Sequence, residues 1–176
     1  DGIGNPKNTK SMLLSHQTPP AMGLGVRDTA ETAVRAGIRH IQFAVRPEED
    51  AVAIDTYLKA LKPVPSPLLE NGKLSASAER GKAVFERAHC AACHIAPLYS
   101  DLKVHDLGTT LGLDAGKPVD TPTLVEVWRT APYMHDGRAA TLMEVLTAHN
   151  KDNRHGDTAS LSEEELKDLA AYVGSL

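Results

Sequence analysis

Apolar residues recur at helical spacing in the last part of the chain. One apolar stripe there consists of Leu166, Leu169, Val173 and Leu176. Ser162 precedes the stripe, and Glu165 follows Ser162 by three residues. This spacing is the capping-box pattern of a helix N-terminus. We therefore predict a terminal helix over residues 162–176 with one face in the core.

Two further segments have helical patterns. One covers about residues 77–88 and places Val84 and Phe85 on its buried side. The other begins at Pro47, continues with acidic residues and runs to Leu61, and a proline followed by acids is typical of a helix start. No segment has a convincing strand pattern. The chain is therefore predicted to be all-α.

A proline-rich stretch divides the chain. Prolines occupy every second position from 63 to 67, which is typical of a stiff, extended connector. We predict a small helical lobe over residues 1–62, a linker over 63–76 and a main domain over 77–176.

Both cysteines of the chain lie directly after the helix predicted over 77–88. Cys90, Cys93 and His94 form a C-x-x-C-H segment, the attachment signature of c-type haem. In such a segment the two thiols add to the haem vinyl groups and the imidazole binds the iron. A zinc site would need a second pair of ligands, and a thioredoxin-like redox pair would need a βαβ context. The segment therefore predicts one covalently bound haem c.

Composition agrees with this prediction. Hydrophobic residues make up 41% of the chain but aromatic residues only 4%, so a haem would supply the large apolar body that the core lacks. The net charge of −4 gives no sign of a nucleic-acid partner, and no apolar run approaches the length of about 20 residues that a membrane span needs. Haem attachment of this type happens outside the cytoplasm. We expect a periplasmic or cell-surface protein whose export signal was removed or lies on a longer precursor.

The two parts of the chain share residues in the same order. At an offset of 112 residues, four identities pair Thr9, Thr18, Pro20 and Met22 with Thr121, Thr130, Pro132 and Met134. At an offset of 109 residues, Thr32 and His40 pair with Thr141 and His149. At an offset of 115 residues, four more identities pair Glu48, Glu49, Tyr57 and Leu61 with Glu163, Glu164, Tyr172 and Leu176. The counterpart of His94 would lie about 18 residues before Asp1. We therefore expect a piece of a larger dihaem protein, in which the first haem's attachment segment precedes this chain.

The sixth iron ligand is open on the residues alone. Met134 lies in a proline-rich loop, and methionine raises the potential of a haem. His149 lies on a helix predicted over 141–150, although a helix C-terminus also favours a histidine that binds no iron. Other candidates on chemical grounds are His105, His135, His155 and Met143. Trp128 and Arg129 are candidates to lie over the haem edge, where Arg129 could pair with a haem propionate. In the alternative, Trp128 is an ordinary core residue and Arg129 is solvated.

Four segments resemble the bacterial dihaem cytochrome c peroxidase and MauG family: TPTL at 121–124, WRTAPY at 128–133, HDG at 135–137 and ATL at 140–142. The resemblance covers about residues 77–176, and residues 5–10 and 18–20 resemble the end of a related haem unit. It implies a cytochrome c-like haem domain, with the small lobe as part of a truncated, related unit.

In that family the distal ligand of the C-terminal haem follows the histidine of the HDG turn by 14 residues, as methionine or tyrosine. Here the resemblance places His149 at this position, so the predicted iron ligands are His94 and His149, with Met134 as the alternative. His40 takes the matching place in the first unit, as a ligand for a second haem. The family also implies a calcium ion between lobes in some members, for which no acidic loop is recognisable here.

The function expected from these features is single-electron transfer to a redox partner protein or a second haem domain. We assign no catalytic residue in this chain. The rival function is part of a peroxidase or MauG-like oxidase, in which this haem feeds electrons to a second, catalytic haem. A third hypothesis is a haem-bearing interaction domain without a redox function, which no particular residue supports.

Overall fold

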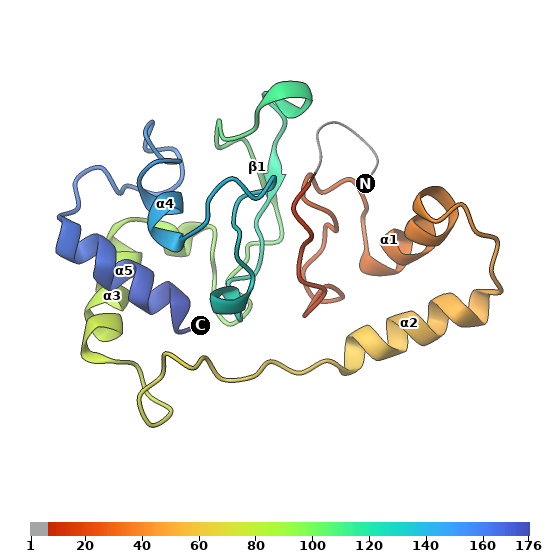
Figure 1. Cartoon of the computed structure of the whole chain (residues 1–176), viewed down its shortest axis with the longest axis horizontal. Coiled ribbons are helices and arrows are strands. Elements are labelled where there is room, and N and C mark those ends of the chain that lie inside the picture. Colours follow the sequence, from red (N-terminus) through yellow and green to blue (C-terminus); the bar gives the residue numbers. More distant parts are fainter. Residues whose placement is uncertain (1–6) are drawn as a thin grey trace.

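The computed structural model describes residues 7–176, which form short helices joined by long loops (Figure 1). In the first half, the elements are α1 (Ala30–Ala36), the π-helix η1 (Gly37–Ile41) and α2 (Glu48–Ala60). The second half contains α3 (Ala76–Arg87), η2 (Cys90–Ala92), β1 (Val104–His105), η3 (Gly112–Asp114), β2 (Val119–Asp120), η4 (Val127–Arg129), α4 (Leu142–Leu146) and α5 (Glu163–Gly174). The prediction of a helical protein is confirmed, except that β1 and β2 form a two-stranded antiparallel pair.

Helices α3 and α5 cross at close range and form the centre of the main core (Figure 1). Gly81 makes this approach possible, because a Cβ atom at this position would lie 1.9 Å from the backbone oxygen of Asp168. Beside the crossing, Phe85 packs edge-on against Tyr172 with ring centroids 5.3 Å apart, and Leu169 is fully buried. The two helices predicted from the apolar patterns therefore pack against each other.

Polar caps fix the ends of these two helices. Ser75 caps α3 by accepting a hydrogen bond from the Ala78 amide, and Ser162 with Glu165 forms the predicted capping box of α5. Asp168 on α5 accepts hydrogen bonds from the Ser77 hydroxyl and from the Arg80 guanidinium on α3. The bonds from Arg80 and then from Ser77 hold the pKa of Asp168 below its usual value.

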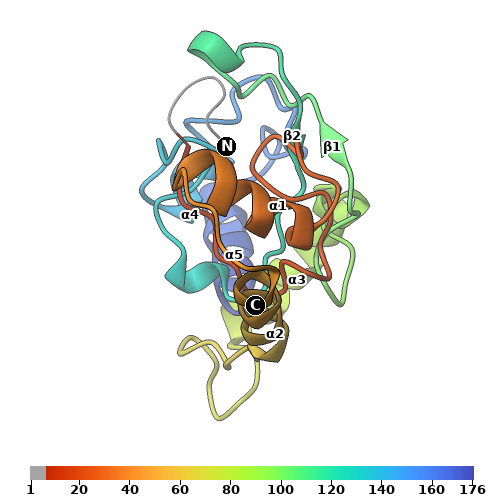
Figure 2. The same cartoon turned by 90° about the vertical axis from the view of Figure 1, so that its right-hand side faces the viewer.

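The small lobe stands on the side of the molecule away from α3 and α5 (Figure 1), and this side faces the viewer in Figure 2. Its own small core contains Val34 of α1 and Ala51 and Leu58 of α2. The buried Asp55 joins the two helices, since it accepts hydrogen bonds from Arg35 of α1 at 2.7 Å and lies 3.1 Å from His16 Nε2. Residues 7–62 thus contain a small helical core of their own, whereas residues 1–6 lie outside the described part; the lobe as a separate domain and its origin as a truncated haem unit stay predictions.

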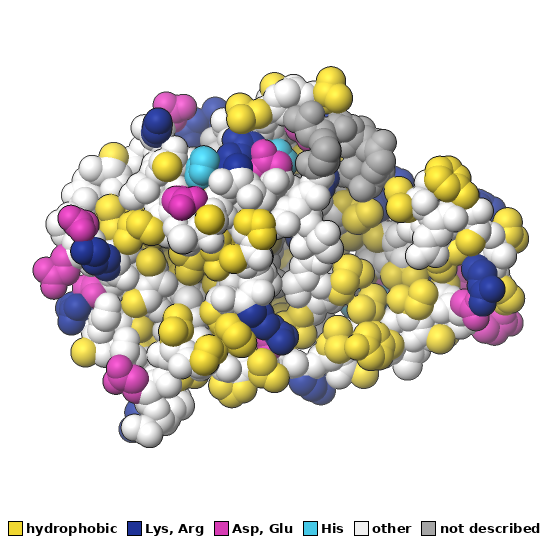
Figure 3. Space-filling view, viewed as in Figure 1, with side chains coloured by type: hydrophobic (Ala, Val, Ile, Leu, Met, Phe, Trp, Pro, Cys, Tyr) yellow, Lys and Arg dark blue, Asp and Glu magenta, His cyan; other side chains and the backbone are white. Residues whose placement is uncertain are grey.

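Apolar side chains cover part of the surface of this lobe (Figure 3). Phe43 is 87% exposed and Val45 is 99% exposed, in the segment between η1 and α2. Val52, Ile54 and Tyr57 of α2 are also exposed. The lobe therefore leaves an apolar surface uncovered within the described residues.

Ion pairs and backbone bonds join residues 7–28 to the main domain. Lys7 lies 2.7 Å from the buried Asp114, and Lys10 lies 2.5 Å from Asp120. The Asn8 amide donates to the carbonyl of His135 at 2.8 Å. The first residues of the described chain thus lie against the loops of the main domain.

The segment predicted as a linker runs without helix or strand from α2 past the C-terminal end of α5 (Figure 1). The buried Ser66 hydroxyl donates to the carbonyl of Gly174 at 2.8 Å. The Val64 amide donates to the side chain of the buried Glu126. The first part of the connector is therefore attached to the main domain at Val64 and Ser66.

One predicted helix is shorter than expected. The pattern predicted a helix over 141–150, but α4 ends at Leu146, and Thr147 has non-helical backbone angles. Beyond this end, the buried Asn150 side chain bonds to the backbone of the loop that follows. His149 therefore lies in a loop beyond α4. In the part of the chain that is described, each helix is too short or too polar to span a bilayer.

Candidate functional site

The C-x-x-C-H segment begins where α3 ends. His89 adopts a left-handed conformation with a φ of 60°, which turns the chain out of α3 and into η2. The His94 amide then donates to the carbonyl of Cys90 at 2.9 Å, so the segment forms one tight turn. Cys90 and Cys93 are not joined by a disulfide, and both are partly buried. This places two thiols and one imidazole at a single turn beside the main core.

The His94 imidazole is held in one tautomer. Its Nδ1 atom lies 2.9 Å from the carbonyl oxygen of Tyr99. A carbonyl can only accept a hydrogen bond, so Nδ1 carries the proton and Nε2 keeps its lone pair. Burial lowers the pKa of His94, and the Tyr99 carbonyl only partly opposes this. His94 is therefore a neutral imidazole with Nε2 available for a metal.

The two cysteine side chains are neutral thiols. Burial raises the pKa of Cys90 to about 11, and burial also raises the pKa of Cys93. A thiolate that binds zinc or attacks a disulfide would need a lowered pKa instead. The environment thus suits thiols that form thioethers better than a thiolate site.

An apolar wall surrounds the turn. Phe85 of α3 packs against Tyr99 with ring centroids 6.3 Å apart, and the Tyr99 and Tyr172 hydroxyls lie 3.2 Å from each other. Other partly buried residues packed on this core are Cys90, Ala91, Leu124, Tyr133, Leu142 and Leu146. The attachment turn is therefore built on the same core as the α3–α5 crossing.

Several polar atoms near these loops are buried without a hydrogen-bond partner among the described residues. They are Trp128 Nε1, His155 Nδ1 and both ring nitrogens of His135, with Arg27 Nε in the small lobe. Buried polar atoms without partners are rare in folded proteins because they lose the hydrogen bonds of water. A haem brings an iron and two propionates, so the side chains present here fit that group.

Trp128 and Arg129 occupy η4. The Trp128 ring lines an apolar pocket of about 360 Å³ together with Tyr133 and Leu142. The Arg129 guanidinium pairs with the buried Glu126 and lies 5.6 Å from the centroid of the Trp128 ring. The structure thus gives Arg129 a carboxylate partner within the protein, whereas the Trp128 donor has none among the residues described.

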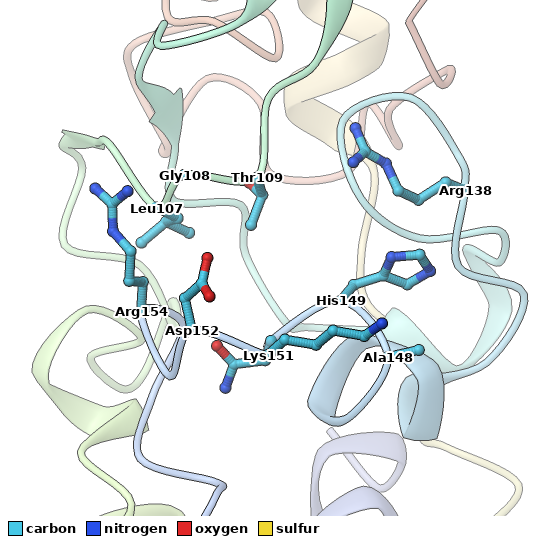
Figure 4. Close-up of a pocket in the computed structure, with 10 residues that line it drawn as sticks. Leu107, Gly108, Thr109, Arg138, Ala148, His149, Lys151, Asp152 and Arg154 are labelled. Atoms are coloured by element: carbon cyan, nitrogen blue, oxygen red, sulfur yellow. The ribbon is translucent and has the colours of Figure 1, made fainter.

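The other predicted ligands lie in different surroundings. His149 is half-buried and lines a polar pocket of about 160 Å³, where its ring lies on the side of Arg138 (Figure 4). Met134 is half-buried in the loop after η4. His40 is exposed on η1 in the small lobe, far along the chain from the attachment turn. These three positions as iron ligands stay predictions.

His155 is the histidine whose ring lies beside His94. The two ring centroids are 6.3 Å apart and the ring planes are inclined by 52°. Burial, and to a lesser degree the nearby His94, lower the pKa of His155 to about 4. Sequence reasoning gave His155 no special weight, because it follows no motif and lies in a polar segment without periodicity.

One further group could hold a metal ion within the described residues. Cys93, Asp101 and His105 bring their ligand atoms close together, and His105 Nε2 lies 2.7 Å from Asp101. Two of the three ligands in this group, the Cys93 thiol and the His105 imidazole, are not the oxygen ligands that calcium prefers. The calcium ion implied by the family resemblance therefore gains no support from this group.

The described features match known cytochromes. The model of a family described as RoxA-like, cytochrome c-like matches residues 120–155. MauG of Methylorubrum extorquens is 31% identical over 128 residues, covering 61% of this chain and 36% of that protein. The cytochrome-c peroxidase IdrP1 of Denitromonas iodatirespirans is 32% identical over 161 residues, covering 61% of this chain and 42% of that protein. The chain is therefore similar to c-type cytochromes of the MauG and cytochrome-c peroxidase kind.

A further relative covers the whole length of this chain. The hydrazine synthase subunit gamma of Kuenenia stuttgartiensis is 29% identical over 233 residues, covering 100% of this chain and 66% of that protein. The chain thus spans 36% to 66% of the length of these three curated relatives.

Solved structures show the same fold. A hydrazine synthase structure from Kuenenia stuttgartiensis superposes with a TM-score of 0.81 and 27% identity over 97% of this chain and 72% of that one. A MauG-like protein associated with microbial copper homeostasis superposes with a TM-score of 0.73 over 99% of this chain and 76% of that one. At 20% identity, the second likeness shows the fold alone.

Proposed function

We propose that this cytochrome domain carries one haem c and transfers single electrons. Cys90 and Cys93 would form the thioether links, and His94 would be the proximal iron ligand. The observation that carries the proposal is the hydrogen bond from His94 Nδ1 to the Tyr99 carbonyl, which leaves the lone pair on Nε2, in the same turn that holds both thiols. Relatives named as cytochromes support the same cofactor.

The protein's own residues would bind and tune the cofactor, whose iron supplies the one-electron chemistry. The Tyr99 carbonyl orients the His94 ring and makes it a more basic ligand. The apolar wall around Phe85 and Tyr172 excludes water from one side of the site, and burial of this kind shifts the potential of a haem. Trp128 Nε1 would find a hydrogen-bond acceptor on the cofactor.

We propose that a histidine fills the sixth iron position. His149 is the residue that the family resemblance predicts, with Met134 as the alternative. Two imidazole ligands would make the iron low-spin and its potential lower than with methionine. A filled sixth position leaves no place for peroxide, which favours electron transfer over catalysis at this haem.

A redox partner protein or a second haem domain would exchange electrons with this haem. The internal repeat supports a second, related unit, and the curated relatives are longer than this chain. In such a larger dihaem protein, His40 would be a ligand of the other haem. Because haem c is attached outside the cytoplasm, we also propose a periplasmic or cell-surface location.

A second function is favoured by the similarity to MauG and to a cytochrome-c peroxidase over 61% of the chain. In this alternative, the domain is part of an oxidoreductase in which its haem passes electrons to a second, catalytic haem. This chain would then supply the electron-transfer site, and the parent protein would supply the reactive one.

Spectroscopy distinguishes these functions. The chain is expressed with a cytochrome c maturation system, and its ferric and ferrous spectra are recorded before and after addition of cyanide and peroxide. Electron transfer predicts low-spin, six-coordinate spectra in both states with no change on addition. A high-spin fraction that binds cyanide or reacts with peroxide would contradict the proposal for this haem.

A further inference from the structure

The geometry points to Tyr99 and Tyr172 as positioning residues that orient His94 and thereby lower the potential of the haem; this inference rests on the proposed binding of haem c. The Tyr99 carbonyl oxygen accepts the Nδ1 proton of His94, with 2.9 Å between the two heavy atoms. The hydroxyl of the same tyrosine lies 3.2 Å from the Tyr172 hydroxyl on α5. Tyr99 therefore connects the proposed iron ligand to a residue of the main core.

The backbone of Tyr99 has a conformation that a tyrosine adopts rarely. Its φ is 51°, in the left-handed region, where the Cβ atom is crowded against a carbonyl oxygen. A residue with a side chain keeps such a conformation only where the surrounding structure holds it there. The same conformation places the Tyr99 carbonyl against His94. The contacts that hold Tyr99 therefore also hold the orientation of the imidazole.

Hydrogen bonds fix the backbone on both sides of Tyr99. The Thr123 hydroxyl donates to the Leu98 carbonyl at 2.6 Å. The buried Ser100 hydroxyl donates to the Thr121 carbonyl at 2.8 Å. These bonds attach both neighbours of Tyr99 to the segment 121–123, but neither of them reaches the Tyr99 side chain. The ring of Tyr99 depends on other contacts.

The crossing of α3 and α5 supplies those contacts. Phe85 of α3 meets the Tyr99 ring edge-on, with centroids 6.3 Å apart and planes inclined by 77°, and it meets the Tyr172 ring in the same way at 5.3 Å. Tyr172 is only 5% exposed, so the Tyr99 hydroxyl takes the place of water as its hydrogen-bond partner. Burial, and then this bond, raise the pKa of Tyr172, so its hydroxyl stays protonated. One hydroxyl pair thus fastens the Tyr99 ring to α5.

The hydroxyl pair can act on the iron through His94. An imidazole whose Nδ1 proton is bound by a carbonyl is a more basic ligand, and stronger donation stabilises ferric iron more than ferrous iron. The bond to Tyr99 therefore lowers the potential. Without the hydroxyl pair, the Tyr99 ring is freed on one side, its left-handed backbone relaxes and its carbonyl moves away from His94. The potential should then rise.

Two single substitutions and their combination test this inference in the haem-loaded chain. Tyr99→Phe and Tyr172→Phe each remove one hydroxyl of the same pair and keep both rings. Each should raise the midpoint potential in a redox titration. Each should also speed the exchange of the His94 Nδ1 proton with water, followed by nuclear magnetic resonance in the reduced protein. The double variant should show no larger change than the single ones, because all three lack the same bond.

Ser66→Ala is the matched control for these variants. It also removes a buried hydroxyl that bonds to α5, since Ser66 donates to the Gly174 carbonyl at 2.8 Å, but this bond has no link to His94. The control should lower the free energy of unfolding, as the tyrosine variants do. It should leave the midpoint potential and the exchange of the His94 proton at their wild-type values.

Three results would overturn the inference. The first is a wild-type potential and wild-type proton exchange in both tyrosine variants. The second is a double variant whose shift is the sum of the single shifts, because the two hydroxyls would then act separately. The third is an equal shift in Ser66→Ala, which would trace the change to lost stability. Failure of the proposed function looks different, since the wild-type chain would then carry no haem in the pyridine haemochrome assay.

Discussion

The Nδ1 atom of His94 lies 2.9 Å from the carbonyl oxygen of Tyr99, five residues further along the chain. This bond links the attachment turn to the loop that packs on the main core, where the Tyr99 ring contacts Phe85. The ring orientation of the proposed ligand is therefore set by the core and not by the cofactor alone. A site of this kind is prepared before the iron is bound.

Replacing His94 should separate iron ligation from covalent attachment. In His94→Gly, the two thiols remain, but the proximal ligand is lost, so the iron should become high-spin. Added imidazole should restore a low-spin spectrum, because it occupies the space of the missing side chain. Absorption and electron paramagnetic resonance spectra measure both states. A low-spin spectrum of the variant without imidazole would argue against His94 as a ligand.

The two cysteines should contribute one thioether each. Cys90→Ala and Cys93→Ala should each keep haem through a single link and show a red-shifted pyridine haemochrome band. The double variant should release its haem under denaturing conditions. Denaturing gels stained for haem and intact mass measure attachment. Covalent haem in the double variant would contradict the assignment of both links.

Gly81→Ala should destabilise the fold although alanine is the better helix former. On an exposed helix, this change would stabilise by up to about 1 kcal/mol. At the crossing of α3 and α5, however, the new Cβ atom would meet the Asp168 backbone oxygen at 1.9 Å, so the helices must move apart. We expect a loss of about 1–3 kcal/mol or more in the free energy of unfolding, measured with denaturant.

Lys82→Ala is the control for this prediction, since Lys82 is exposed on the same helix. It should change the free energy of unfolding by less than about 0.5 kcal/mol. Equal or greater stability of Gly81→Ala relative to wild type would show that α3 and α5 do not cross this closely.

The Asp168 carboxylate should make stability depend on pH in the acid range. The bonds from Arg80 and Ser77 lower its pKa in the folded state below the ordinary value of 3.8. A lowered folded pKa contributes stability that is present above the unfolded pKa and is lost as the pH falls through the folded pKa. The stability difference between wild type and Asp168→Asn should therefore be largest near neutral pH and shrink below about pH 4.

Glu163→Gln is the matched control for this pair. Glu163 also has a lowered pKa, because it accepts a hydrogen bond from Lys167 four residues further along α5, but both side chains are exposed. Exposed pairs contribute little, so this variant should behave like wild type at every pH. A pH-independent effect of Asp168→Asn, measured by chemical unfolding, would contradict the role of the ion pair.

The main helices and the attachment turn could be predicted because local chemistry determines them. The capping residues Ser162 and Glu165 and the apolar side of α3 leave short-range patterns in the sequence. Tertiary contacts determine what was missed. The Asn150 side chain holds the loop after α4 by bonding to its backbone, and the Asp157 amide attaches that loop to Ala88. Neither effect produces a periodicity or a spacing that can be seen in the sequence.

The most direct test of the account is the mass of one peptide. The chain is expressed with a cytochrome c maturation system and digested with trypsin, which should release residues 88–103, between Arg87 and Lys103, as one fragment. We predict that this fragment carries the mass of one haem in addition to its amino acids and absorbs visible light, with one haem per intact chain. A colourless fragment with the mass of the bare peptide would contradict the proposed cofactor and the electron-transfer function built on it.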